Sequence, residues 1–184
     1  MKYLEIRRHT MRQKPGKHLT QAGVSLARQV GASMGPFTKV ITSDVVRAFE
    51  TAIAMGFAVD EQLADLAPLE DDGVITALED APTFAEVAQI ARSHKAVGRC
   101  ARELARVWTS IAESLPEEGV ALVITHGLVI ELGAAGCLPD ADFSTWGAVC
   151  DYCEGIRLSF DGKRFVGGEV IRLSQTKSSS SRKR

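Results

Sequence analysis

The sequence predicts an α/β domain built as a three-layer sandwich, in which a mixed, mostly parallel sheet carries helices on both faces. Short apolar or β-branched runs alternate with helical patterns along the chain, as expected for parallel strands joined by helices. The run Gly119–Gly127 is almost wholly apolar, which is typical of a strand buried on both faces. Asp161-Gly162 separates two alternating runs near the C-terminus and indicates an antiparallel hairpin.

The bulk composition predicts one soluble domain. The chain has 184 residues with 45% apolar residues, 24% charged residues and a formal net charge of −1, which argues against a nucleic-acid partner. No segment approaches the roughly 20 apolar residues of a membrane span, and the start holds too short an apolar run for a signal peptide. We therefore expect a cytoplasmic protein without a membrane partner. The domain is expected over residues 1–174.

Two minor features are read as non-functional. Residues 175–184, "QTKSSSSRKR", are expected to form a disordered polar and basic tail, with a basic interaction arm as the alternative. Cys150 and Cys153 have C-x-x-C spacing, but no second pair and no nearby histidines complete a zinc set. Together with Cys100 and Cys137 they are expected to be reduced thiols.

The N-terminal half predicts two strand and helix pairs. Lys2–Arg7 alternates in the manner of a strand. Apolar residues then recur at intervals of three and four, which predicts a helix with Thr20 as its N-cap and Gly35-Pro36 as its end. Thr38–Ser43 is β-branched and predicts a second strand. In the helix that follows it, one face is formed by Val46, Phe49 and Ile53.

The rest of the chain predicts further helices around the buried strand. We expect a short strand near Leu66–Leu69, followed by an acidic loop. Pro82–Leu115 has helical composition, and Gly98 is expected to divide it into two helices. Another helix, "LVIELGAAG", directly follows the buried strand.

A basic cluster follows the strands. Ligand sites in α/β sheets lie beyond the carboxyl ends of the strands, where Arg8, His9 and His126 are expected. Arg47 lies in the first turn of a helix, where it opposes the helix dipole, and its side chain should lean back toward the strand end. The alternative for Arg47 is a surface ion pair with Glu50 or Asp44.

Two imidazoles and two guanidiniums favour phosphoryl transfer. A guanidinium is a planar fork suited to phosphate oxygens, and an imidazole can act as a nucleophile or as a hydrogen-bond donor. A metal site fits poorly because arginine is not a metal ligand. For a lone histidine such as His9, the alternative is a polar loop residue.

Three segments carry a family resemblance. "IRRHT", "TSDVVRAFETA" with its S-x-x-x-R-A-x-x-T-A pattern, and "VITHG" resemble, in order, the motifs of the histidine phosphatase superfamily, also called phosphoglycerate-mutase-like. The resemblance implies that His9 attacks phosphorus and becomes a transient phosphohistidine. It also implies that Arg8, Arg47 and His126 bind the equatorial oxygens, that water hydrolyses the intermediate, and that no metal or cofactor is needed.

The chain departs from the family pattern after His9. The family usually has glycine there, whereas this chain has Thr10, whose hydroxyl would add a phosphate contact or whose Cβ would crowd the phosphate. Only nine residues separate His9 from Leu19, which predicts an open, shallow site that favours hydrolysis over a mutase reaction. The residues expected on its rim, either as substrate-binding groups or as a solvated basic loop, are Arg12, Lys14, Lys17 and His18.

The proton donor for the leaving group is the third departure. Gly127 excludes an aspartate directly after the second histidine, and Glu70 is the candidate, with Asp71 and Asp72 close behind. The alternative is a solvated acidic loop. In that case only substrates with good leaving groups, such as phosphoramidates, would turn over well.

The expected function is hydrolysis of a phosphomonoester or a phosphohistidine through His9. The partner is then a phosphorylated small molecule or a phosphoprotein, the latter in the manner of the short bacterial phosphohistidine phosphatases that the open loop resembles. The competing expectation is a non-catalytic phosphate-binding or scaffold domain of the same fold.

Overall fold

A mixed sheet forms the middle layer of the molecule. The computed structural model describes residues 1–173, and within them six strands follow the order β3-β2-β4-β1-β5-β6. The pairs β3/β2, β2/β4 and β4/β1 are parallel, whereas β1/β5 and β5/β6 are antiparallel. The strands are β1 Lys2–Arg8, β2 Lys39–Ser43, β3 Glu61–Leu63, β4 Val120–Thr125, β5 Gly155–Phe160 and β6 Phe165–Ile171.

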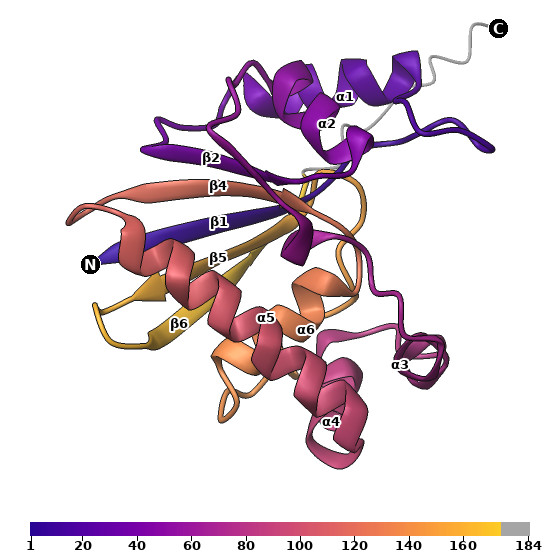
Figure 1. Ribbon diagram of the computed structural model, residues 1–184, viewed down its shortest axis with the longest axis vertical. Coiled ribbons are helices and arrows are strands. Elements are labelled where there is room, and N and C mark those ends of the chain that lie inside the picture. The colour runs from indigo at the N-terminus through magenta and orange to yellow at the C-terminus, as the bar shows by residue number, and fades with distance from the viewer. Residues whose placement is uncertain (174–184) are drawn as a thin grey trace, which may run out of the picture.

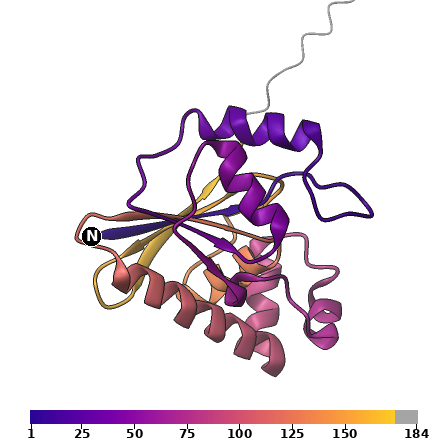
Figure 2. The ribbon, with the colours of Figure 1, turned by 45° about the horizontal axis from the view of Figure 1, so that its top comes forward.

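Helices cover both faces of this sheet, which confirms the predicted fold class (Figure 1). Helices α1 and α2 lie on one face, and α4, α5 and α6 lie on the other, with α3 beside α5 (Figure 2). The helices are α1 Gln21–Gly31, α2 Val46–Met55, α3 Asp72–Leu78, α4 Phe84–Ser93, α5 Lys95–Ser114 and α6 Val129–Cys137, and the 3-10 turn η1 is Ala64–Leu66.

The central strands are buried because their apolar residues face a helical layer on each side. Leu4 and Ile6 of β1 are fully buried, as is the run Ala121–Ile124 of β4. Each leucine or isoleucine buried in this way contributes about 1.5–3 kcal/mol of apolar transfer free energy. This packing places the carboxyl ends of β1 and β4 at fixed positions next to each other.

Small residues bring α6 close to α5. A Cβ at Gly133 would overlap the ring of Trp108, and a Cβ at Gly136 would overlap the carbonyl of Ala101. Because α6 starts three residues after His126, this close packing also fixes the direction in which the chain leaves β4.

The region between α2 and α4 was predicted wrongly. The strand expected near Leu66–Leu69 lies earlier, at β3, and Leu66 is buried in η1, where its carbonyl accepts the Thr125 hydroxyl. The expected acidic loop is partly a helix, because Asp71 caps α3 by accepting from the backbone N–H of Val74. A capping carboxylate one residue before an apolar pattern explains this helix.

The expected helix break at Gly98 was also wrong. The break occurs at His94, whose side chain accepts from the backbone N–H of Val97 and caps α5. Gly98 lies inside α5, and a Cβ there would lie 2.5 Å from the carbonyl oxygen of Ala91 in α4. The glycine therefore permits a close helix crossing rather than ending a helix.

Helices α1 and α2 agree with the prediction in place but not in every detail. Thr20 caps α1 as expected, accepting from the N–H of Gly23, but the helix ends at Gly31, before Gly35-Pro36. In α2 the predicted apolar face is turned outward, since Phe49 is 37% and Ile53 49% exposed. The helix packs through Ala48, Thr51, Ala52 and Met55 instead.

The C-terminal hairpin is confirmed. Asp161 Oδ1 accepts from the N–H groups of Lys163 and Arg164, and Gly162 adopts a φ of 99°. The predicted tail, residues 175–184, lies outside the described residues. None of the helices within residues 1–173 is long and apolar enough to cross a bilayer.

Candidate active site

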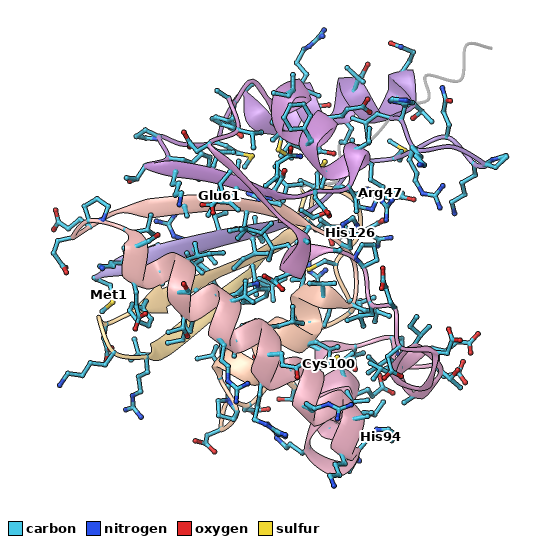
Figure 3. All side chains as sticks on the ribbon, viewed as in Figure 1. Met1, Arg47, Glu61, His94, Cys100 and His126 are labelled. Atoms are coloured by element: carbon cyan, nitrogen blue, oxygen red, sulfur yellow. The ribbon has the colours of Figure 1, made fainter. Side chains whose placement is uncertain are left out.

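The predicted basic cluster is assembled at one edge of the sheet. Arg8 ends β1 and His9 follows it, His126 follows β4, and Arg47 lies in the first turn of α2. The imidazole centroids of His9 and His126 are 5.1 Å apart, and Arg47 Nε lies 3.0 Å from His9 Nε2. Figure 3 shows Arg47 and His126 near one another at this edge. The structure therefore brings the four residues together.

His9 presents an unprotonated nitrogen. Its Nδ1 lies 2.7 Å from the carbonyl oxygen of Thr10, and because a carbonyl oxygen only accepts, Nδ1 carries the proton. Nε2 then holds the lone pair, which accepts from Arg47 Nε–H. A neutral imidazole with a free lone pair is the form that a nucleophile requires.

His126 is the same tautomer, but here the hydrogen bond that fixes the ring is made by Nε2. Ser43 Oγ accepts from the N–H of Val45 and lies 2.8 Å from His126 Nε2. Within residues 1–173 the Ser43 hydroxyl has no other acceptor, so it donates to Nε2 and the proton of His126 lies on Nδ1. That nitrogen is buried and has no partner among the described residues.

The guanidinium of Arg8 is anchored by a hydrogen bond from Nη1 and by the ring of Tyr152. Its Nη1 donates to the carbonyl of Cys150 at 2.8 Å, and its Cζ lies 4.7 Å from the ring centroid of Tyr152. A Cβ at Gly127 would lie 3.3 Å from Cζ and Nε, so the glycine leaves room for the guanidinium. Arg8 Nε is buried without a partner in the described part of the chain.

Two buried N–H donors without partners indicate an anion site. Buried polar groups in native proteins are nearly always hydrogen-bonded, and an unsatisfied one costs about 1–3 kcal/mol. Arg8 Nε and His126 Nδ1 are such donors, and both belong to the cluster that contains His9. An oxyanion is the kind of acceptor that both donors lack.

The electrostatics keep both imidazoles neutral. Burial lowers the pKa of His9 to about 4, with the nearby Arg47, Arg8 and Arg12 acting in the same direction and the hydrogen bond to Thr10 opposing. Burial lowers the pKa of His126 to about 3, assisted by His9, Arg47 and Arg8. At neutral pH the positive charge of the cluster therefore comes from its arginines.

Thr10 anchors the loop and does not offer its hydroxyl to a ligand. Its hydroxyl donates to the carbonyl of Gly23 in α1, and its N–H donates to the hydroxyl of Thr51 in α2. The residue is fully buried. The side chain thus joins the residue after His9 to both helices of this face.

The basic loop divides into one residue close to the site and three that are more remote. Arg12 donates to the carbonyls of Gln13 and Gly16, and its charge lowers the pKa of both His9 and Arg47. His18 pairs with Glu50, with 2.5 Å between Nδ1 and Oε1. Lys14 and Lys17 are exposed.

Glu70 lies along a separate acidic cavity. It is exposed, and within residues 1–173 it forms no hydrogen bond or ion pair with the four clustered residues. The cavity is about 670 Å³, and its polar lining includes Asp44, Asp65, Cys100 and Glu103. Asp44 directly follows Ser43, so this cavity reaches the start of α2.

The sequence reasoning assigned no role to three residues of the site. Ser43 orients His126, and Thr51 accepts from Thr10 while donating to the carbonyl of Arg47. Both are the serine and threonine of the S-x-x-x-R-A-x-x-T-A pattern, so the signal was present. Tyr152 stacks on Arg8 and lies 6.0 Å from the His9 ring, and no sequence signal indicated it.

Across residues 1–173, no group of three or more His, Cys, Asp and Glu side chains is arranged to hold a metal ion. The candidate site consists of two guanidiniums and two imidazoles, with one nucleophilic nitrogen in the same cluster as N–H donors that suit an oxyanion.

Comparisons with known proteins show a family match and a shared fold. The family model of the histidine phosphatase superfamily, branch 1, matches residues 5–170. A comparison with curated protein sequences found no significant match. Among solved structures, phosphoserine phosphatase from Entamoeba histolytica, crystallised with 3-phosphoglyceric acid, has a TM-score of 0.68 at 13% identity, covering 94% of this chain and 98% of that one.

Two further solved structures show the same fold. Phosphoglycerate mutase from Bacillus anthracis has a TM-score of 0.64 at 17% identity, covering 89% of this chain and 90% of that one. YhfR from Bacillus stearothermophilus has a TM-score of 0.64 at 19% identity, covering 90% and 95%. At these identities the likeness is one of fold, and it extends along nearly the whole chain.

Proposed function

Because the chain belongs to the histidine phosphatase superfamily, we propose that it is a phosphatase that hydrolyses a phosphomonoester or a phosphohistidine through a covalent phosphohistidine on His9. The observation that carries this proposal is the pair of unsatisfied donors, Arg8 Nε and His126 Nδ1, in the same cluster as the unprotonated Nε2 of His9. A nucleophile in one cluster with donors that suit an oxyanion supports the proposed chemistry.

In the first proposed step the phosphoryl group enters the cluster. Its oxygens accept from Arg8, Arg47 and His126 Nδ1. The Nε–H of Arg47 exchanges its hydrogen bond to His9 Nε2 for one to a phosphate oxygen. This frees the lone pair of Nε2 for in-line attack. The P–Nε2 bond forms as the bond from phosphorus to the leaving oxygen or nitrogen breaks, and the leaving group takes the electron pair.

In the second step a water molecule attacks the phosphohistidine from the side that the leaving group vacated. The bond from phosphorus to the water oxygen forms as the P–Nε2 bond breaks, and Nε2 recovers its lone pair. Inorganic phosphate is released, and the protons of the water stay on it or pass to solvent. The guanidiniums stabilise the charge on the equatorial oxygens in both steps. The loop before α1, residues 10–18, is short and largely exposed, which favours access of water and hydrolysis over a mutase reaction. The proposed steps use no metal or cofactor.

Protonation of the leaving group is the step that selects substrates. Glu70 is the proposed general acid for alkyl phosphates, supported by its place in the cavity that reaches Asp44 at the start of α2. Phosphoramidates and aryl phosphates have leaving groups that depart with less assistance. They are therefore the substrates expected to turn over fastest.

The test is hydrolysis of an aryl phosphate by the wild type and by His9→Ala. Turnover should be inhibited by vanadate and lost in His9→Ala. A rapid-quench experiment with a substrate labelled in its phosphoryl group should detect an acid-labile phosphoenzyme in the wild type only. His94→Asn is the matched control, because His94 caps α5 at the far end of the molecule (Figure 3). Equal turnover in His9→Ala and wild type would refute the proposal.

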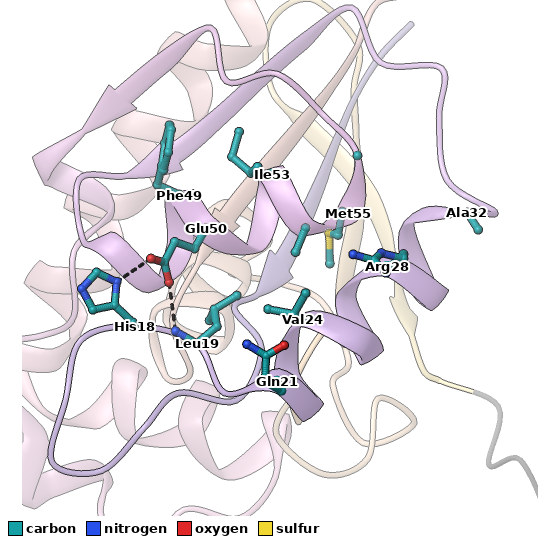
Figure 4. Close-up of a pocket in the computed structure, with 12 residues that line it drawn as sticks. His18, Leu19, Gln21, Val24, Arg28, Ala32, Phe49, Glu50, Ile53 and Met55 are labelled. Atoms are coloured by element: carbon teal, nitrogen blue, oxygen red, sulfur yellow. Dashed lines mark hydrogen bonds and ion pairs between the residues drawn. The ribbon is translucent and has the colours of Figure 1, made fainter.

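A second candidate substrate class, a phosphoprotein, is supported by an apolar groove on α1 and α2. The groove is about 750 Å³ and is formed by side chains that include Val24, Phe49 and Ile53, with Arg28 along it and the His18–Glu50 pair at its end (Figure 4). Arg47 lies two residues before Phe49 in the same helix. An apolar surface next to a phosphate site would bind the protein that carries the phosphoryl group.

Substrate comparison separates the two classes. Phe49→Ser and Ile53→Ser should leave hydrolysis of an aryl phosphate unchanged and should raise KM only for a phosphoprotein. If both substrates respond equally, or neither does, the groove takes no part in substrate binding. A protein that binds phosphate but shows no turnover with any substrate would instead be a phosphate-binding or scaffold domain.

A further inference from the structure

One buried carboxyl group near the site takes no part in the steps proposed above. Glu131 lies in the first turn of α6 and is 1% exposed. Its Oε1 accepts from the backbone N–H of Cys150 at 2.7 Å, and its Oε2 is buried without a hydrogen-bond partner within residues 1–173. Burial raises the pKa of this carboxyl group, so it is held in the protein at an energetic cost.

Cys150 links Glu131 to Arg8 through its backbone. The N–H of Cys150 bonds Glu131, and the carbonyl of the same residue accepts from Arg8 Nη1 at 2.8 Å. Because Nη1 is engaged in this way, the remaining edge of the guanidinium, Nε and Nη2, is left for phosphate oxygens. A fork of this kind binds phosphate through two parallel hydrogen bonds only if its plane is fixed.

The segment around Cys150 has further contacts with the site. Tyr152 covers the Arg8 guanidinium, with 4.7 Å between the ring centroid and Cζ. The N–H of Cys153 donates to the carbonyl of Arg8, and the N–H of Arg8 donates to the carbonyl of Glu154. The segment thus forms the wall against which Arg8 lies, and Glu131 ties that wall to α6, the helix that follows His126.

We propose that Glu131 is a positioning residue, which sets the orientation of the Arg8 guanidinium through Cys150 and thereby the affinity of the site for phosphate. The proposal rests on the function proposed above. A simpler role for an acidic residue in a first helical turn is to stabilise the end of α6. That role would affect the stability of the protein but not the affinity of the folded protein for phosphate.

The two roles are separated by a double-mutant cycle on phosphate and vanadate binding, measured by calorimetry. Glu131→Met keeps the volume and removes the acceptor, and it should weaken binding by about 5- to 100-fold, as expected when a buried hydrogen bond is lost. Glu131→Gln keeps an acceptor oxygen and should stay within about threefold of wild type. In an Arg8→Lys background, Glu131→Met should cause less than about a twofold further loss, since the two residues act as one unit.

Ile111→Val is the matched stability control, because Ile111 is buried on α5 and lies outside the cluster. If Glu131→Met does not fold, Glu131→Asp provides the same test, since its shorter side chain withdraws the acceptor from Cys150. Equal losses in the wild-type and Arg8→Lys backgrounds, or lower stability with unchanged phosphate affinity, would overturn the proposal. Failure of the wild type itself to bind phosphate or vanadate would instead overturn the proposed function.

Discussion

Replacing Ser43 by alanine tests the assignment of the His126 proton. The Ser43 hydroxyl donates to His126 Nε2 at 2.8 Å and leaves Nδ1–H as the donor to phosphate. In Ser43→Ala the ring loses this constraint, and the neutral imidazole can hold its proton on either nitrogen. The expected result is a lower rate of hydrolysis with the fold intact.

The magnitude follows from the burial of the bond. His126 is 3% and Ser43 0% exposed. Loss of a partner at such a site costs about 1–3 kcal/mol, which corresponds to roughly 5- to 150-fold in kcat/KM if the bond acts fully in the transition state. The N–H of Val45 also loses its acceptor, so a small decrease in stability is expected as well.

The neighbouring hydroxyl provides the control. Thr42 is fully buried in the same strand, and its Oγ1 has no hydrogen-bond partner in residues 1–173. Thr42→Val removes a hydroxyl of the same kind and should leave kcat/KM within about twofold, with equal or higher stability. The assay is hydrolysis of an aryl phosphate. If Ser43→Ala retains full activity, or Thr42→Val loses as much, the tautomer assignment is wrong.

Three further predictions concern proton transfer, pH and packing. Glu70→Gln should slow hydrolysis of alkyl phosphates by about 100-fold and of phosphoramidates far less, and equal slowing would remove Glu70 from the role of general acid. The folded pKa values of His9 and His126, about 4 and 3, lie below the ordinary 6.5, so the folded state binds fewer protons than the unfolded state. The free energy of unfolding should therefore be at its full value above pH 6.5. Below that pH it should fall by up to about 1.4 kcal/mol per pH unit for each histidine. A denaturant midpoint that is equal at pH 7 and pH 5 would contradict this. Gly133→Ala should destabilise the protein by about 1–3 kcal/mol, because the new methyl group overlaps Trp108. The measurement is thermal unfolding. The control is Gly167→Ala, which should match wild type because its methyl group meets open space.

The sequence predicted the fold class and the place of the site for one physical reason. Buried parallel strands read as apolar runs, and their carboxyl ends lie at one edge of the sheet, so Arg8, His9 and His126 were expected together. Arg47 was found because it breaks the charge preference of a first helical turn.

The parts that were missed depend on tertiary contacts. The helix break at His94 and the passage of α5 through Gly98 are decided by the close approach of α4, which no local preference shows. The outward face of α2 was misjudged because its buried face consists mostly of small residues, which carry a weak apolar signal. Tyr152 reaches Arg8 across 144 positions of sequence, and only the folded chain brings the two together.

The neutral state of the two histidines has a consequence for charge balance. Because both imidazoles are neutral, the inner cluster carries the charges of Arg8 and Arg47 alone. A bound phosphomonoester dianion would neutralise these two charges, whereas a phosphodiester or a carboxylate would bring one negative charge and leave one partly buried positive charge uncompensated. We therefore expect the proposed site to prefer a monoester dianion over a singly charged competitor, because only the dianion balances the charges of both guanidiniums.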